Sequence, residues 1–168
     1  MDTASRMDRP LRLAVSMLLP ASCLFALLAG SAVYVLDRPW ASAMFLAPLA
    51  AWQPESSVSF GWAGNSLPSL FHAYAFSLLI ILALRPARHA RLAGAVSWLL
   101  VATGLECLQA GAVQRLIEDG PGAIAAVPFA DSFHLYIVNG RFDGIDLLAT
   151  WLGVAIAYLA SSVLEARP

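Results

Sequence analysis

The chain has 168 residues, of which 60% are hydrophobic and only 12% are charged. Soluble domains carry about 25% charged residues, so this composition excludes an ordinary water-soluble globular protein. The ten basic residues are all arginines, and eleven acidic residues bring the net charge to −1. This balance excludes the basic surface of a nucleic-acid-binding protein, and no nucleic-acid partner is expected.

Four apolar stretches follow one another along the chain, each long enough to cross a lipid bilayer. A transmembrane helix needs about 20 apolar residues and must satisfy its backbone hydrogen bonds internally. The stretches cover residues 13–36, 67–84, 92–111 and 145–164. The sequence therefore predicts an all-α fold, a polytopic transmembrane bundle of about four helices that forms a single domain over residues 1–168.

The first stretch shares features with a secretory signal, because a basic leader precedes an apolar run and the small residues Ala29 to Ser31. The apolar core of a signal peptide has about 7 to 15 residues, and this run is longer. We therefore expect a retained helix that Pro20 kinks, with cleavage after the run as the alternative.

The two longer connections contain apolar segments that are too short to span. Residues 37–66 include MFLAPLAAW, flanked by Trp40, Trp52 and Trp62, which is typical of an interfacial segment with its Trp rings at head-group level. Residues 112–139 include AIAAVPFA around Pro128. This loop is expected either to enter the membrane partway or to lie on its surface.

The arginines predict the orientation, since basic residues in short loops stay in the cytoplasm. Three precede the first span and three fill the short link between the second and third, namely Arg6, Arg9, Arg12, Arg85, Arg88 and Arg91. The longer connections hold only Arg38, Arg115 and Arg141. We therefore predict a multi-pass protein of the bacterial inner (cytoplasmic) membrane with both termini in the cytoplasm.

Polar residues near the ends of the spans are the candidate site, because a charge at membrane depth costs about 2.5 to 3.5 kcal/mol on insertion scales. Residues three apart share a helix face. Glu106 and Gln109 form such a pair near the end of the third span, and Asp143 and Asp146 form one at the start of the fourth. In the predicted topology all of these residues reach the outer leaflet. The expected pocket between the last three spans is lined by His72, Glu106, Gln109, Arg141, Asp143 and Asp146.

Each of these residues also has a purely structural interpretation. Asp143 can cap the last helix and favour its dipole, and Arg141 can reach up to phosphates. Glu106 can pair with Arg141 and join two helices. His72 can be a satisfied histidine at a helix end, and a haem between His72 and His134 is a remote alternative.

Two segments resemble the VanZ-like family of membrane proteins. They read GLECLQ and, after a loop, GRFDGIDLLATWLG, and the segment LPSLFHAYAFSLLIIL resembles the histidine-bearing helix of that family. The resemblance covers roughly residues 67–160. The family's polar residues then correspond to His72, Glu106, Gln109, Arg141, Asp143, Asp146 and Gly153.

The chain departs from the family pattern at three points. Thr150 stands where the family usually has Asn, the charged residue shortly before the histidine is missing, and the loop over residues 111–139 is longer. The namesake of the family is associated with low-level resistance to a glycopeptide antibiotic that carries a lipid tail. The resemblance implies a role near cell-envelope lipids or lipid-linked molecules.

Three functions are compatible with these patterns. In the first, the outer pocket binds a membrane lipid or lipid-linked molecule, with Arg141 gripping an anion through its planar fork. In the second, Glu106 is the general base of an enzyme, although no nucleophile motif supports catalysis. In the third, the chain is an accessory subunit with a membrane protein partner, which contacts small residues such as Gly144 and Gly153.

No cofactor and no metal site are indicated by the sequence. The two cysteines, Cys23 and Cys107, both lie inside apolar runs. We expect them to be small hydrophobic residues, neither joined in a disulfide nor paired on a metal.

Overall fold

The computed structural model is a bundle of long helices, and it describes residues 3–40, 46–54, 58–118, 133, 136–138 and 140–165. The long helices are α1 (Thr3–Asp37), α2 (Trp62–Ala83), α3 (Ala90–Leu108) and α6 (Gly144–Glu165). Each contains a segment that is long and apolar enough to cross a membrane, and these segments are Met17–Asp37, Trp62–Ala83, Ala90–Leu108 and Gly144–Ser162. The chain is therefore an all-α, multi-pass membrane protein, as predicted.

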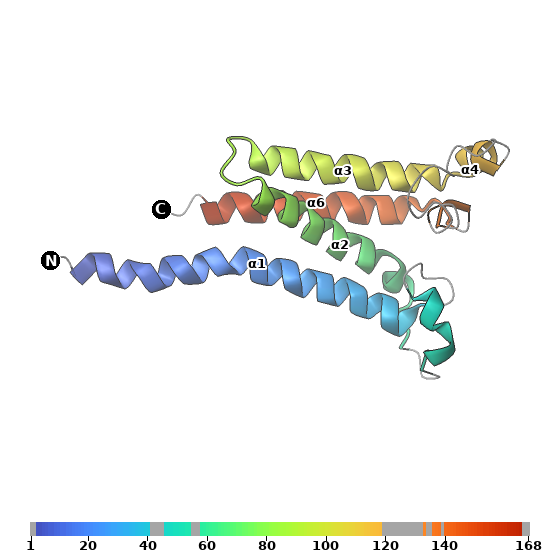
Figure 1. The fold of residues 1–168 in the computed structure, drawn as a ribbon, viewed down its shortest axis with the longest axis horizontal. Helices are drawn as coiled ribbons and strands as arrows, with labels where there is room; N and C mark the ends of the chain where they lie inside the picture. The colour runs from blue at the N-terminus through green and yellow to red at the C-terminus, as the bar shows by residue number, and fades with distance from the viewer. Residues whose placement is uncertain are drawn as a thin grey trace.

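The two termini lie at one end of the bundle and the two long connections at the other (Figure 1). This arrangement follows from an even number of spans, because each short or long connection reverses the direction of the chain. The end with the two long connections is called the loop end below. Which end faces the cytoplasm remains a prediction from the arginines.

Helix boundaries differ from the sequence expectations where prolines and glycines stand. Pro20 lies within α1, which continues through it. Helix α2 begins before Pro68, at Trp62, after Gly61 adopts a positive φ of 59° that favours glycine. Helix α3 ends at Leu108, three residues earlier than expected, and the chain turns there into the short helix α4 (Gly111–Glu118) where a loop was expected.

The first long connection contains the 3₁₀ helix η2 (Ala47–Trp52), which lies inside the apolar segment predicted to be interfacial. The Trp52 side chain at its end is 81% exposed, and Trp62 at the start of α2 is 83% exposed. Exposed Trp rings at the end of a span are typical of the head-group level of a bilayer.

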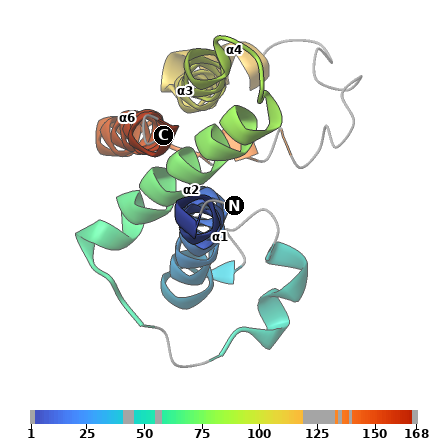
Figure 2. The same ribbon diagram turned by 90° about the vertical axis from the view of Figure 1, so that its left-hand side faces the viewer.

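Helix α2 is the centre of the bundle, with α1 on one side and α3 and α6 on the other (Figure 2). It packs most extensively against α6, then α1, then α3. Close approach depends on glycine: a Cβ on Gly153 would lie 2.4 Å from the Leu70 carbonyl oxygen, and one on Gly94 would lie 2.8 Å from the Ile81 nitrogen. Gly153, which the family resemblance selected, therefore serves helix packing.

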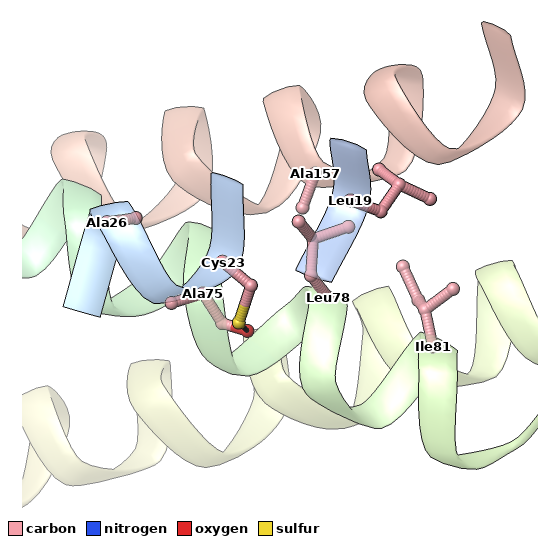
Figure 3. Packing of buried hydrophobic residues seen from close by; sticks show 7 residues of the cluster. All are labelled: Leu19, Cys23, Ala26, Ala75, Leu78, Ile81 and Ala157. Carbon is pink, nitrogen blue, oxygen red and sulfur yellow. Dashed lines mark hydrogen bonds between the residues drawn. The ribbon is translucent and has the colours of Figure 1, made fainter. Parts of the chain in front are cut away.

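The apolar core lies in the half of the bundle that carries the termini, where α1, α2 and α6 meet (Figure 3). Its members are Leu19, Cys23, Ala26, Ala75, Leu78, Ile81 and Ala157. Small residues dominate it, because association of helices in lipid depends on close packing. Cys23 is buried with its thiol donating to the Ala75 carbonyl at 3.4 Å, and both cysteines are free, so the expectation of no disulfide between them is confirmed.

Candidate functional site

Glu106 and Gln109 join the end of α3 to the start of α6. The Glu106 Oε1 atom accepts a hydrogen bond of 3.0 Å from the backbone N–H of Asp143. The Gln109 carbonyl accepts a second one, of 3.3 Å, from the N–H of Phe142, and the Gln109 side chain is only 7% exposed. A Cβ on Gly140 would lie 2.4 Å from the Gln109 side chain, so this glycine makes room for the buried amide.

Asp143 is the N-cap of α6. Its Oδ1 atom accepts a hydrogen bond of 2.8 Å from the backbone N–H of Ile145, and α6 begins at Gly144. A carboxylate at this position satisfies a backbone donor that has no partner within the helix. The structural interpretation of Asp143 as a helix cap is therefore the one that the geometry supports.

Asp146 lies one turn further along α6 and faces the start of α2. The side chains of Ser66 and Ser69 interact with its carboxylate, and Glu106 is near enough for the two charges to interact. The Oδ1 atom of Asp146 is buried and has no hydrogen-bond partner among the described residues. A buried acceptor of this kind is costly unless something else donates to it.

Arg141 does not lie between the carboxylates. Its side chain is exposed, and among the described residues it forms no ion pair with Glu106 or Asp146. The pairing of Glu106 with Arg141, given above as a structural alternative, is therefore not formed in the described part of the chain. The backbone N–H of Asp143, not a guanidinium, is the donor to Glu106.

Arg38, which directly follows α1, is the cation near these carboxylates. Its charge acts on Asp146, and its guanidinium carbon lies 4.7 Å from the centre of the Tyr34 ring. One terminal nitrogen donates to the Asn65 carbonyl at 2.9 Å. The Nε atom is buried and has no hydrogen-bond partner in the part of the chain that the structure describes.

His72 lies beside this group and faces α1. Its ring stacks on Tyr34 with centroids 5.8 Å apart, and a Cβ on Gly30 would lie 2.9 Å from its Nε2 atom. Among the described residues the charges of Glu106 and Asp146 act on Tyr34, whereas burial is the effect that acts on His72. The contacts of His72 are therefore with α1 and the aromatic ring of Tyr34.

Tyr136 comes from the second long connection and closes the group near α3. Its hydroxyl interacts with the Gln109 side chain, and burial, reinforced by the Glu106 charge, raises the pKa of the Tyr136 phenol. The amide of Gln114 on α4 donates to the carbonyls of Ile137 and Gly140, each at 2.7 Å. These bonds hold the end of the connection against α4, while His134, the second residue of the haem alternative, lies outside the described residues.

The residues that the structure brings together at the loop end come from the four long helices and the two long connections. We call them the polar cluster: Tyr34, Arg38, Ser66, Ser69, Glu106, Gln109, Tyr136 and Asp146. Sequence reasoning missed Tyr34 and Arg38, although their spacing of four residues at the end of a span places an aromatic ring under a cation. No three His, Cys, Asp or Glu side chains among the described residues are placed to hold a metal ion.

The fold defines the chain as a multi-pass membrane protein of four spans. Comparison with protein-family profiles, with curated proteins and with solved structures gives no match. The geometry of the polar cluster is thus the basis for assigning a function.

Proposed function

We propose that the polar cluster binds the head of a membrane lipid or of a lipid-linked, amphipathic envelope molecule. The proposal includes the relationship to VanZ-like proteins, which rests on the segments around His72, Glu106 and Asp146. It also includes the bacterial inner membrane as the location, with both termini in the cytoplasm and the polar cluster at the outer leaflet.

The observation that carries the proposal is a group of polar side chains at the ends of the spans, in which two buried atoms of charged residues stay unpaired. Asp146 is the third residue of its span, and Arg38 directly follows the end of α1. Each has a buried atom without a hydrogen-bond partner among the described residues. Ionisable residues at this depth are costly, and in membrane proteins they mark sites of function.

The neighbouring surface suits an amphipathic ligand. The outward faces of the spans are apolar, with Phe25 68% exposed and Leu148 65% exposed. Acyl chains can lie along such faces while the head reaches the polar cluster. Lipid is already present at this place in a membrane, so a modest affinity is enough for occupancy.

Lipid retention by the purified protein tests the proposal. Native mass spectrometry would be carried out on protein extracted from vesicles of total bacterial lipid. We expect the wild type to retain lipid. The double variant Glu106→Gln/Asp146→Asn should retain at least tenfold less lipid than the wild type, because both carboxylates of the polar cluster are removed.

The matched control is Arg141→Gln, which removes an exposed charge from the same end of the bundle and should retain lipid like the wild type. Equal retention by the double variant and the wild type would refute the assignment of the site. Reporter fusions at the C-terminus and within residues 112–139 test the orientation independently.

An accessory role in a membrane complex is the second candidate, and the exposure of α3 favours it. Only 11% of the α3 span is buried, against 33% of the α2 span. A partner helix on α3 would cover residues such as Leu92, Val96 and Leu100, which are now exposed. Copurification with one protein at fixed stoichiometry, lost in the variant Leu100→Trp, would support this role over lipid binding.

A further inference from the structure

Two buried atoms of opposite character remain unpaired in the polar cluster. One is the Nε donor of Arg38, and the other is the Oδ1 acceptor of Asp146. The charges of the two residues interact, yet these two atoms do not bond to each other. A ligand that satisfied both would have to accept one hydrogen bond and donate another.

We infer that the head group bound by the polar cluster is zwitterionic, with an anionic oxygen for Arg38 and a primary ammonium for Asp146. This inference rests on the proposed function and names the chemistry of its ligand. Arginine suits a phosphate or carboxylate oxygen through its fixed N–H donors. A carboxylate that lacks a donor suits an ammonium with N–H groups, which can supply one.

The charges around the two atoms exclude a purely anionic head as the best fit. The cluster holds two carboxylates, Glu106 and Asp146, and one cation, Arg38, since the Arg141 side chain is exposed and lies outside the cluster. An anion alone would gain Arg38 and be repelled by both carboxylates. An ammonium on the same head would be attracted to the carboxylates, so their interaction with the head becomes favourable.

The geometry also separates a primary ammonium from a quaternary one. A choline head carries the same charges but no N–H donor, and it is held in proteins mainly by aromatic faces. The Tyr34 ring already lies against the Arg38 guanidinium on one side and His72 on the other. The unpaired Oδ1 atom therefore favours the head that can donate a hydrogen bond.

Binding of defined phospholipids to the full-length protein tests the inference. The purified protein would be titrated, in native mass spectrometry, with phosphatidylethanolamine, its N-monomethyl and N,N-dimethyl forms, phosphatidylcholine and phosphatidylglycerol, all with the same acyl chains. We expect phosphatidylethanolamine to bind about tenfold more tightly than phosphatidylcholine and phosphatidylglycerol, which corresponds to about 1.4 kcal/mol. Affinity should fall with each added methyl group.

Two variants should change this series in different ways. Asp146→Asn should remove the preference for phosphatidylethanolamine over phosphatidylcholine and strengthen phosphatidylglycerol binding, because one of the two repelling carboxylates is gone. Arg38→Gln should weaken all the phospholipids alike and preserve that preference, because the phosphate is common to them. The control Asp143→Asn keeps the cap of α6 and should leave the series unchanged.

Competition by a soluble head group tests whether the cluster recognises a free ligand or needs a whole lipid. Phosphoethanolamine that competes at millimolar concentration would show that the head alone provides the recognition, and no competition would show that the acyl chains are needed as well. Either result supports the zwitterion if the lipid preference is present.

Equal binding of phosphatidylethanolamine and phosphatidylcholine by the wild type would overturn the inference. This comparison uses the wild-type protein alone, so it does not depend on whether a variant folds. If lipids then still bind and Glu106→Gln/Asp146→Asn loses them, the proposed function stands without the zwitterion. If no lipid binds to the wild type, both fail.

Discussion

At the terminal half of the bundle, α1 and α2 approach each other through Leu19, Cys23 and Ala75, and the polar groups among these residues are satisfied. At the loop end, Arg38 directly after α1 and Ser66 on α2 act on the Asp146 carboxylate, and two buried polar atoms stay without partners in the described chain. The terminal half also holds one such atom, because the Oγ atom of Ser77, beside Ala75 and Leu78 on α2, is buried without a hydrogen-bond partner among the described residues. The two unpaired atoms at the loop end differ from it because they belong to charged side chains, whose burial without a partner costs more.

Substitution at Gly153 should have the largest effect, because it acts on the packed half directly. A Cβ there meets the Leu70 carbonyl oxygen at 2.4 Å and the Tyr74 nitrogen at 3.0 Å, and backbone atoms cannot move aside. We expect Gly153→Val to lower stability by about 3 kcal/mol, the upper end for overpacking. Thermal denaturation in detergent, followed by circular dichroism, measures it.

Gly104→Val is the matched control, since no atom lies within 4 Å of a Cβ at Gly104. It should keep the melting temperature of the wild type. A Gly153→Val protein that melts with the control would show that α2 and α6 do not pack as closely as described.

Truncation of Leu78 should have the next largest effect. Its side chain is fully buried in the core. Leu→Ala in a core costs about 2 to 5 kcal/mol, and the lower value is expected here because lipid is as apolar as the core and only packing is lost. The same measurement on Leu100→Ala, at a side chain that is 68% exposed, should show almost no change.

Two substitutions at Glu106 separate charge from hydrogen bonding in the polar half. Glu106→Gln retains an oxygen for the Asp143 N–H, so stability should stay within about 0.5 kcal/mol while lipid retention falls. Glu106→Ala removes the acceptor as well and should cost about 1 kcal/mol. If both variants lose stability equally, the negative charge itself holds α3 to α6.

The smallest effect concerns Tyr136 and pH. Burial raises the pKa of its phenol in the folded protein, so the folded state resists ionisation more than the unfolded state does. The free energy of unfolding is therefore unaffected by Tyr136 below the ordinary tyrosine pKa, and it falls as pH rises above about 10. The melting temperature of Tyr136→Phe should fall less between pH 8 and pH 11 than that of the wild type.

The number of spans follows from the sequence, because apolar length is a local property. Glu106 and Gln109 were expected on one face, and both meet the start of α6. Their facing partners were not predictable. In lipid every face of a span is apolar, so the pattern does not say how each helix is rotated against its neighbours.

That rotation decides which arginine reaches the carboxylates. Arg38 and Arg141 both stand near span ends in the sequence, yet only Arg38 is turned towards Asp146. His72 likewise meets Tyr34, a residue distant in sequence whose contact depends on how α1 crosses α2. The helix α4 was missed because its eight residues, Gly111–Glu118, begin with glycine and carry no apolar run.

The Gln114 amide has a consequence for the design of tagged proteins. It donates to the carbonyls of Ile137 and Gly140, so both ends of the stretch between α4 and residue 137 are tied at one point. Lengthening a loop with fixed ends costs little, about 0.6 kcal/mol for each doubling. A hydrophilic epitope inserted within residues 120–130 should therefore be accommodated without moving the spans, which offers a handle for purification from the loop end.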